Sequence, residues 1–400
     1  MKKKSKRKNQ FGGTMSEYSI GEVTASDSYS RAAVKALLEK EGIRLDANLD
    51  YTCAMYDEDM NVIATGSLFM NTLRCMAVSS DHQGEALMNE IVTHLVQKQM
   101  ERGMMHLFLY TKCDTAKFFA TMGFYEIARI EGHLVFMENR RDGFSSYLKQ
   151  LRSETEAQLT EKGGEFAGWA KEDTDEKTEK KREDKSDEKQ DEKTKKIAAV
   201  VMNANPFTLG HRHLLETASK DHDLVHVFVV SEDASLFPFH VRKKLVMEGS
   251  RDLSNLIYHE SGPYIISNAT FPSYFQKSGE DVIRGHALLD LNIFGHIAEE
   301  LGITERFVGE EPRSQVTGIY NEIMHEELPK LGLRCVEIPR LRNSETDEVI
   351  SASDVRSALK SSDVQSLERL LPKTTLDYVK SEDAKPVLEA IRGAQDVIHY

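Results

Sequence analysis

Hydrophobic and polar positions in the first 150 residues alternate between a helical period and a strand period. The segment 30–40 has the spacing of an amphipathic helix, whereas 51–56 and 62–69 are short runs rich in strand-forming residues. The expected elements, in chain order, are helix 30–40, strands 51–56, 62–69 and 73–78, a long helix ending near Glu101, strand 105–110, helix 115–122 and a last strand. This order predicts an α+β domain over residues 16–150.

The pattern changes after residue 196 to strands that alternate with helices. Residues 197–202 are an uninterrupted apolar run, which is typical of a strand buried on both faces, and 224–230 repeats it. Later strands are expected at 307–309 and 333–338. This alternation predicts a Rossmann-like, doubly wound parallel sheet over residues 197–400. In such sheets, ligands bind outside the carboxyl ends of the strands.

The two halves are joined by a segment of very different composition. From Lys171 to Lys196 the chain contains no aliphatic or aromatic side chain, so this stretch cannot bury a core. We therefore predict a disordered charged linker over residues 151–196, a plain connection rather than an interaction tail. Residues 1–15 are expected to be a disordered basic leader. They do not resemble a secretory signal, because such a signal has an apolar run after its basic residues and this chain has none there.

Composition narrows the class of protein. A chain of 400 residues is long enough for two cores, and it contains no run of 18 apolar residues that would predict a membrane span. The formal net charge of -13 argues against a surface built for nucleic acid. The four cysteines lack C-x-x-C spacing, which favours free thiols in a reducing cytoplasm. A cytoplasmic protein with no membrane or nucleic-acid partner is expected.

The first candidate site follows the first strand of the second half. It has the sequence Asn205-Pro206-Phe207-Thr208-Leu209-Gly210-His211, and a helix is expected to begin near Gly210. A helix N-terminus carries unpaired N–H groups and partial positive charge, which suit a phosphate. Gly210 permits close backbone approach, and His211 lies in the first turn, where its side chain could meet the same phosphate.

A second segment, Ile350-Ser351-Ala352-Ser353-Asp354-Val355-Arg356, opens another predicted helix. Helix capping alone accounts for one serine. Arg356, however, lies one turn beyond Ser353 on the same face. Two hydroxyls, free N–H groups and a guanidinium at one helix start make a candidate phosphate site.

Together the two segments resemble the signatures of the nucleotidyltransferase superfamily. The first matches (H/T)-x-G-H, with Thr208 in the first position, and the second matches I-S-x-(S/T)-x-x-R. They occur in the expected order, about 140 residues apart. A P-loop kinase is disfavoured, because G-x-x-x-x-G-K-(S/T) is absent from the sequence.

The intervening sequence is similar to that of the citrate lyase ligase family over nearly the whole second half. The blocks that carry this resemblance are 262–267, 269–275, 307–312, 316–317 and 320–324. The first half resembles a Gcn5-related acetyltransferase module, through Gln83-Gly84-Glu85-Ala86, 116–119 and 122–124. Citrate lyase ligases also carry an acetyltransferase-like region before the nucleotidyltransferase domain, so the order of the halves agrees.

In the acetyltransferase fold, N–H groups of the loop before the long helix hold the pyrophosphate of coenzyme A. The resemblance therefore makes Gln83, Gly84 and Ala86 candidate coenzyme-binding residues. That family usually has Gln or Arg three residues before the glycine, where this chain has Asp81. A coenzyme-binding role and a purely structural role both stay open for this half.

The family resemblance implies a reaction. ATP, acetate and the prosthetic-group thiol of the citrate lyase acyl carrier protein would give the acetyl thioester, AMP and diphosphate, through an acetyl-adenylate, with Mg²⁺ bridging the phosphate oxygens. Thr208 and His211 would contact the α- and β-phosphates, and His211, Thr208 and Arg356 are the candidate catalytic residues. Ser351, Ser353 and Arg356 would hold the β/γ end. The candidate ATP-binding residues are Asn205, Pro206, Phe207, Thr208, Gly210, His211, Ser351, Ser353 and Arg356.

Other assignments stay open at this point. Arg242, Glu310 and Glu311 are candidate pocket residues, and no spacing of histidines suggests a metal held by the protein. One alternative is another nucleotidyltransferase-fold enzyme, such as a phosphopantetheine adenylyltransferase or a pantothenate-synthetase-like ligase. Another is an acetyl-coenzyme A-dependent acetyltransferase whose second half only binds nucleotide, and a third is a non-catalytic regulator. The sequence does not distinguish acetate from a neighbouring short acid.

Overall fold

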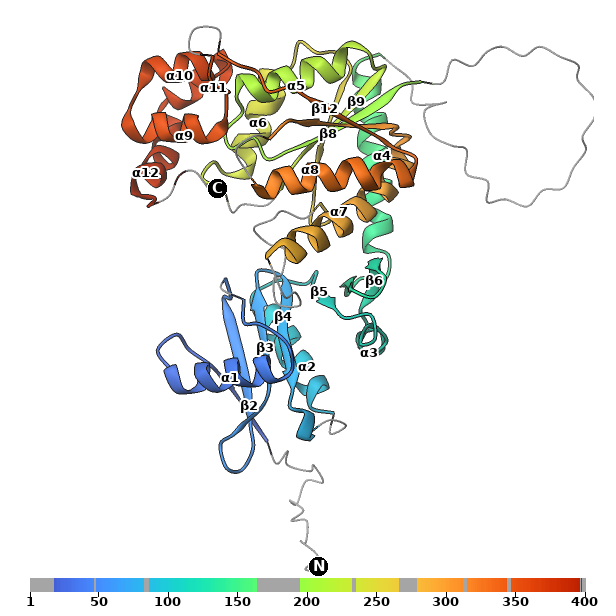
Figure 1. Ribbon diagram of the computed structural model, residues 1–400, viewed down its shortest axis with the longest axis vertical. Coiled ribbons are helices and arrows are strands. Elements are labelled where there is room, and N and C mark those ends of the chain that lie inside the picture. Colours follow the sequence, from blue (N-terminus) through green and yellow to red (C-terminus); the bar gives the residue numbers. More distant parts are fainter. Residues whose placement is uncertain are drawn as a thin grey trace, which may run out of the picture. The chain divides into compact units, whose positions relative to one another are not determined.

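The computed structural model describes residues 18–46, 48–82, 86–163, 195–231, 235–265, 279–311, 315–343, 347–395 and 397. The chain divides into two compact units (Figure 1). The first comprises Met1–Gly143 with Pro272–Gly285, and the second comprises Phe144–Phe271 with His286–Tyr400. Each unit is built around its own β-sheet. The predicted leader at 1–15 lies outside the described residues.

A seven-stranded mixed sheet forms the first unit. Its strands, in spatial order, are β1 (Ser19–Glu22), β2 (Tyr51–Tyr56), β3 (Val62–Phe69), β4 (Thr72–Val78), β5 (Phe108–Thr111), β7 (Leu134–Glu138) and β6 (Tyr125–Ile130). The helices of this unit are α1 (Ser28–Lys40), the 3₁₀ turn η1 (Ser80–His82), α2 (Leu87–Glu101) and α3 (Ala116–Thr121). The α+β fold expected for this half is confirmed.

The strands β4 and β5 pair in parallel at only two positions. Thr72 is opposite Phe108 and Leu73 is opposite Leu109, but no pairing follows further along these two fully described strands. Beyond that point β5 stays paired with β7 on its other side. The carboxyl ends of β4 and β5 therefore part and leave room for a cavity between them.

Helix α2 lies close to the sheet because β3 carries a glycine beneath it. A Cβ at Gly66 would come within 2.6 Å of Ile91 and 2.8 Å of Leu95, both on α2. On the other face, Val34 and Leu38 of α1 pack in a separate core cluster that includes Cys75. The two helices thus sandwich the middle of the sheet.

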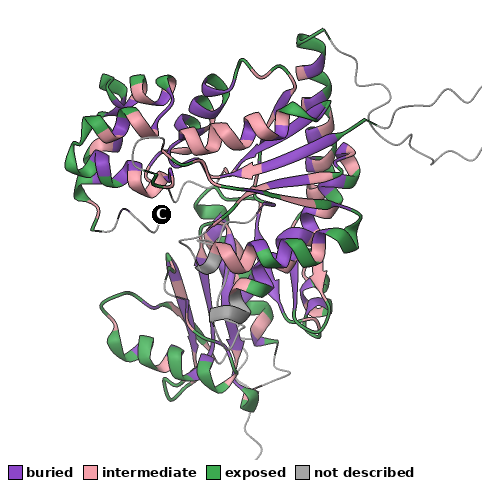
Figure 2. Cartoon of the chain, turned by 45° about the horizontal axis from the view of Figure 1, so that its top comes forward, coloured by how far each residue is buried: buried purple, intermediate pink, exposed green. Residues whose placement is uncertain are grey.

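The second unit contains a five-stranded parallel sheet. Its spatial order is β10 (Leu256–Glu260), β9 (Leu224–Val229), β8 (Ile197–Met202), β11 (Glu305–Gly309) and β12 (Arg334–Ile338). Helices α5 (Leu209–Lys220) and α6 (Phe239–Gly249) cover one face, and α7 (Gly279–Leu301), from His286 on, and α8 (Gln315–Glu327) cover the other (Figure 1). The predicted doubly wound parallel sheet is confirmed, and its central strands are buried (Figure 2).

Four short helices follow the last strand. They are α9 (Ala352–Ser361), α10 (Val364–Leu370), α11 (Lys373–Val379) and α12 (Lys385–Gly393), with a 3₁₀ turn at η3 (Glu382–Ala384). Another 3₁₀ turn, η2 (Leu328–Leu331), precedes β12. Val355 and Leu359 of α9 join the same core cluster as Val200 of β8 and Val227 of β9. Helix α9 is therefore fixed to the sheet and holds its N-terminus at the sheet's edge.

The helix α4 (Gly143–Glu161) closes the free edge of the parallel sheet at β10. The side-chain amide of Gln158 donates to the carbonyl of Tyr258 at 2.8 Å and accepts from its N–H at 2.9 Å, as a neighbouring strand would. Tyr147 donates its hydroxyl to the carbonyl of Ser261 at 2.9 Å, and Lys162, just past the helix, donates to that of Leu256. These contacts satisfy backbone groups that an edge strand otherwise leaves unpaired.

The start of the predicted linker is therefore wrong. Instead of becoming disordered at residue 151, the chain continues in α4 to Glu161, because Tyr147, Leu151, Thr155 and Leu159 form a buried stripe at four-residue spacing. Residues 164–194 lie outside the described part of the chain. Among the described helices, none is both long and apolar enough to cross a membrane.

The bonding of Gln158 to the edge strand gives a test of this arrangement. We expect Gln158→Ala to lower the free energy of unfolding of the second unit by about 1–3 kcal/mol, because it leaves the Tyr258 N–H and carbonyl without partners. Gln150→Ala is the matched control: Gln150 is exposed on the same helix and bonds only to Glu154 among the described residues, so its loss should cost under about 0.5 kcal/mol. Urea unfolding of both variants measures the difference, and equal stabilities would contradict the role of Gln158.

Candidate active site

A cleft of about 910 Å³ lies at the carboxyl ends of the parallel strands in the second unit. Its walls come from the loop after β8, the first turn of α5, the ends of β11 and β12, helix α8 and the first turn of α9. Seven of the nine candidate ATP-binding residues line it: Asn205, Thr208, Gly210, His211, Ser351, Ser353 and Arg356. The two sequence motifs therefore meet at one cleft.

The first turn of α5 is closed by a reciprocal cap between Thr208 and His211. The Thr208 hydroxyl oxygen accepts from the His211 backbone N–H at 3.3 Å, and Nδ1 of His211 accepts from the Thr208 backbone N–H at 3.1 Å. This is a capping box in which histidine takes the place of the usual Glu or Gln. Since a backbone N–H can only donate, Nδ1 carries no proton and the neutral ring is protonated at Nε2.

The imidazole of His211 is held in its neutral form. Burial is the main cause, and the charges of Arg340 and Arg356 add to it, so that the pKa of His211 falls to about 4. The ring also stacks on Phe207, with centroids 6.0 Å apart. Among the described residues, Nε2 has no hydrogen-bond partner. This N–H group is therefore available to a ligand in the cleft.

The two helix openings are in direct contact. A Cβ at Gly210 would lie 3.1 Å from the carbonyl oxygen of Ile350, so a larger residue would push the starts of α5 and α9 apart. Arg356 of α9, only 2% exposed, donates from a terminal nitrogen to the carbonyl of Asn205 at 2.6 Å. It also donates to Val397 and to the hydroxyl of Ser353. Arg356 thus binds the two motifs together, and its contact with phosphate stays a prediction.

The second opening is capped by Ser351. Its hydroxyl oxygen accepts from the Asp354 N–H at 3.2 Å, and the hydroxyl donates to the Asp354 carboxylate at 2.7 Å. Of the three candidate pocket residues named from the sequence, Glu311 lines the cleft. The prediction that Ser351 and Ser353 contact phosphate stays a prediction.

Several candidate residues lie outside the cleft lining. Arg242 is fully buried, and its guanidinium donates to the carbonyls of Asn203 and Val230 and to Phe237, at 2.8–2.9 Å. The expectation that Arg242 lines the nucleotide pocket is therefore wrong, because carbonyls at the ends of β8 and β9 require its donors. Pro206, Phe207 and Glu310 do not line the cleft either, and their contact with a nucleotide stays a prediction.

Phe207 packs in the core instead. It lies so close to α6 that a Cβ at Gly249 would come within 2.6 Å of its ring. Its ring, fixed in the core, stacks on the imidazole of His211 and so helps to hold that side chain in place. Glu310 is exposed at the end of β11.

Sequence reasoning missed Arg340. This residue lines the cleft just after β12, donates from Nε to the carbonyl of Glu310 at 2.6 Å, and pairs with Glu311. Arg340 stands two residues after β12, and a cation just past the carboxyl end of a parallel strand lies at the ligand edge of the sheet, so that position was the available signal. Nδ2 of Asn205, one of the candidate ATP-binding residues, is a further donor at the cleft: it is buried and has no partner among the described residues.

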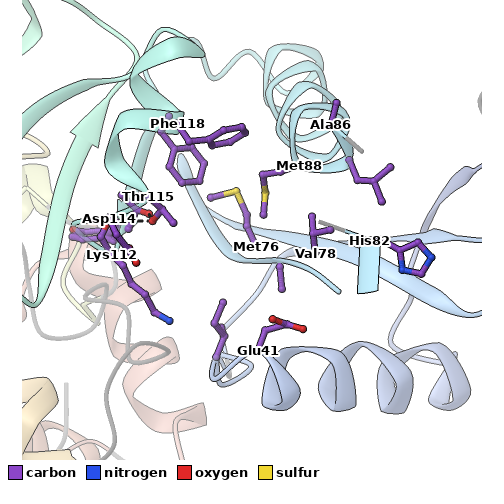
Figure 3. Close-up of a pocket in the computed structure, with 16 residues that line it drawn as sticks. Glu41, Met76, Val78, His82, Ala86, Met88, Lys112, Asp114, Thr115 and Phe118 are labelled. Carbon is purple, nitrogen blue, oxygen red and sulfur yellow. Dashed lines mark hydrogen bonds between the residues drawn. The ribbon is translucent and has the colours of Figure 1, made fainter. Parts of the chain in front are cut away.

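The first unit contains a separate cavity of about 600 Å³ between the parted ends of β4 and β5. Figure 3 shows Met76, Val78, Met88 and Phe118 projecting into this apolar space. Ala86, one of the candidate coenzyme residues, lines it and begins α2 with a φ of 58°. The other two candidates, Gln83 and Gly84, lie outside the described residues.

Carboxylates surround the described part of the loop before α2. Glu41 accepts the Ser80 N–H at 2.9 Å and also lines the cavity, and Asp81 pairs with Lys40 at 2.8 Å. One backbone donor that could face a pyrophosphate is therefore already bound to an anionic side chain. Coenzyme binding by this unit stays a prediction.

Comparison with known proteins adds the family. A family model described as the citrate lyase ligase C-terminal domain matches residues 197–379. A [citrate [pro-3S]-lyase] ligase of Haemophilus influenzae is 33% identical over 87% of this chain and 94% of its own length. That of Escherichia coli is 33% identical over 90% and 93%. The chain belongs to the citrate lyase ligase family.

Solved structures are similar to parts of this family member. A putative acyl-CoA N-acyltransferase from Klebsiella pneumoniae subsp. pneumoniae aligns over 30% of the chain and 95% of its own, with 18% identity and a TM-score of 0.25. A putative nicotinate-nucleotide adenylyltransferase from Vibrio parahaemolyticus aligns over 51% and 99%, with 16% identity and a TM-score of 0.31. The region matched by the family model contains both helix openings of the cleft.

The lowered pKa of His211 predicts how stability depends on pH. Free imidazole titrates near 6.5 and His211 near 4, so between these values the unfolded chain binds the proton more tightly. Stability from neutral His211 is complete above pH 6.5 and is lost as the pH falls towards 4. Because the ring reaches the cleft, we expect wild type to lose only about 1–2 kcal/mol more than His211→Gln over this window, measured by urea unfolding. Parallel losses in the two proteins would show that His211 is not held neutral.

The carboxylates of the first unit predict weak binding of coenzyme A. We expect Glu41→Gln combined with Asp81→Asn to tighten that binding about two- to tenfold, because two negative charges beside the loop are removed. Glu39→Gln, near the end of α1 but outside the cavity lining, is the control for the loss of a carboxylate away from the loop. Isothermal titration calorimetry measures all three proteins, and an unchanged affinity in the double variant would exclude an electrostatic barrier.

Proposed function

We propose that the protein uses ATP and acetate to acetylate the prosthetic-group thiol of the citrate lyase acyl carrier protein, releasing AMP and diphosphate. The observation that carries this proposal is the meeting of two helix N-termini and the neutral Nε2–H of His211 in one cleft. The relatives named [citrate [pro-3S]-lyase] ligase, at 33% identity over most of the chain, support the same reaction.

The first step makes the acid reactive. A carboxylate is a poor electrophile, because its oxygen is a poor leaving group. One acetate oxygen attacks the α-phosphorus of ATP, the bond from that phosphorus to the bridging oxygen of the β-phosphate breaks, and diphosphate leaves. The product, acetyl-adenylate, carries a good leaving group on its carbonyl carbon.

The cleft supplies donors where negative charge builds in this step. The free N–H groups at the starts of α5 and α9 face the phosphates, and Arg340 adds a positive charge nearby. His211 donates a hydrogen bond from Nε2. Because its ring is neutral and Nδ1 already accepts from Thr208, the Nε2–H stabilises the transition state without giving up its proton.

In the second step the thiol gives its proton to the solvent and the sulfur attacks the acetyl carbon. The bond from that carbon to the phosphate oxygen breaks, and AMP leaves with the electron pair. The donors that held the α-phosphate in the first step hold the departing AMP in the second. One set of cleft residues therefore serves both steps.

Mg²⁺ enters this scheme together with ATP, as a counter-charge on the phosphate oxygens. Within the described ranges no group of three His, Cys, Asp or Glu side chains could hold a metal by itself. Asp354 and Glu311, which line the cleft, are the carboxylates closest at hand for a metal carried by the nucleotide.

The role of His211 is tested by acid-dependent exchange of diphosphate into ATP. We expect His211→Ala to lower the rate with acetate by about 10²-fold or more, because one preorganised donor to the phosphate is lost. His240→Ala, an exposed histidine of the same unit, is the control and should retain the wild-type rate. A His211→Ala rate within a few-fold of wild type would remove His211 from the mechanism. Testing wild type with pantoate and phosphopantetheine separates the related nucleotidyltransferase reactions.

A further inference from the structure

The cleft has a second wall on the other face of the parallel sheet. Phe307 of β11 joins the core cluster with α5 and α6, so its neighbours Arg306 and Val308 point to the opposite face. There Arg306 lies over the ring of Phe294 on α7, 4.4 Å from its centroid. Both Arg306 and Val308 line the cleft.

Arg306 is a buried cation whose donors are mostly unused. The residue is 5% exposed, a terminal nitrogen of its guanidinium lies 3.5 Å from a carboxylate oxygen of Asp290, and the Tyr320 hydroxyl lies beside the same guanidinium. A well-formed pair of this type has a distance of about 2.7–2.9 Å. Nε of Arg306 is buried without a partner in the same set of residues. Burying donors in this way is costly unless a ligand meets them.

Asp290 is occupied by a different neighbour. Tyr320 of α8 donates its hydroxyl to the same Asp290 oxygen that faces Arg306. Burial raises the pKa of Tyr320 well above its usual range, and the Asp290 charge adds to the effect, so the hydroxyl keeps its proton. Oδ2 of Asp290 thus has a strong donor already, whereas its Oδ1 is buried without a partner among the described residues. Arg306 keeps donors that can receive a second anion.

The surroundings of Arg306 fit a small acid. Val201, Val308 and Met324 line the cleft on this side, and they offer apolar surface next to the cation. A carboxylate with a short alkyl group matches this combination. A phosphate chain, in contrast, matches the helix openings on the far wall.

We propose that Arg306 binds the carboxylate of the acid substrate, with Tyr320 and Asp290 holding the guanidinium in place. This inference rests on the proposed function and adds the residue that recognises the acid. It places the acid on the α7/α8 face and the leaving diphosphate at the openings of α5 and α9. The two then lie on opposite sides of the α-phosphorus, as in-line displacement requires.

A purely structural ion pair linking α7, β11 and α8 is the competing explanation. It predicts that losing Arg306 affects folding and both substrates alike. Binding of the acid predicts a selective change, because ATP contacts other residues. The Michaelis constants for acetate and for ATP, measured separately by diphosphate exchange, therefore discriminate between the two.

The main variant combines Arg306→Met with Asp290→Asn, which removes both charges and leaves no unpaired ion in the interior. We expect its KM for acetate to rise about 10- to 100-fold, because the variant loses the hydrogen-bonded ion pair between Arg306 and the acid. The KM for ATP should stay within about threefold of the wild-type value. Arg306→Lys keeps the charge without the planar fork and should give an intermediate KM for acetate. Arg334→Met, an exposed arginine on the adjacent strand β12, is the control and should leave both constants unchanged.

Thermal unfolding first establishes that each variant is folded. Equal rises in both Michaelis constants, or an unchanged KM for acetate in the folded double variant, would refute the assignment of Arg306 and leave the proposed function standing. Wild-type protein that shows no exchange with any short acid would refute the proposed function, and the assignment of Arg306 with it.

Discussion

The buried guanidinium of Arg356 is the contact on which the cleft depends. It comes from one helix opening and donates to the carbonyl of Asn205, at the start of the other motif, 151 positions earlier in the chain. A single arginine, with its donors spent on carbonyls and on Ser353, therefore sets how close the two helix N-termini stand. Gly210 removes the one side chain that would keep them apart. The positive ends of two helices can then act on the same ligand.

This arrangement concentrates positive potential at the cleft through two helix ends and through arginines that are held in place. The full charges that act on His211, those of Arg340 and Arg356, are each held by neighbouring protein atoms. Their combined field, together with burial, keeps His211 uncharged. A neutral donor fixed by its own helix cap needs little reorganisation when charge develops on a phosphate. Thr208, read from the sequence as a phosphate contact, has in the structure the task of fixing the histidine's tautomer.

Local patterns in the sequence were enough to predict both fold classes and the two motifs that meet at the cleft. Uninterrupted apolar runs mark parallel strands, and a glycine or serine at a helix start follows from capping chemistry. The fates of Arg242 and Arg340 could not be predicted in this way. Arg242 lies in helix α6 and Arg340 follows β12, and only the tertiary arrangement decides that one meets backbone carbonyls while the other reaches the cleft. The surroundings of Arg306 could not be predicted either, because its guanidinium faces Asp290 and Tyr320, which come from two other helices.

The strand β10 was also missed, since Leu256–Glu260 is short and ends in polar residues. The outer edge of β10 is covered by helix α4, which lies before residue 197. The family model matches residues 197–379 and so does not include this helix. A fragment that starts at residue 197 would carry the whole cleft but leave the outer side of β10 uncovered. Its free N–H and carbonyl groups would invite strand addition between molecules, so such a fragment would be prone to self-association and aggregation. A fragment that keeps this edge covered therefore has to begin near residue 143, well before the first strand of its own sheet.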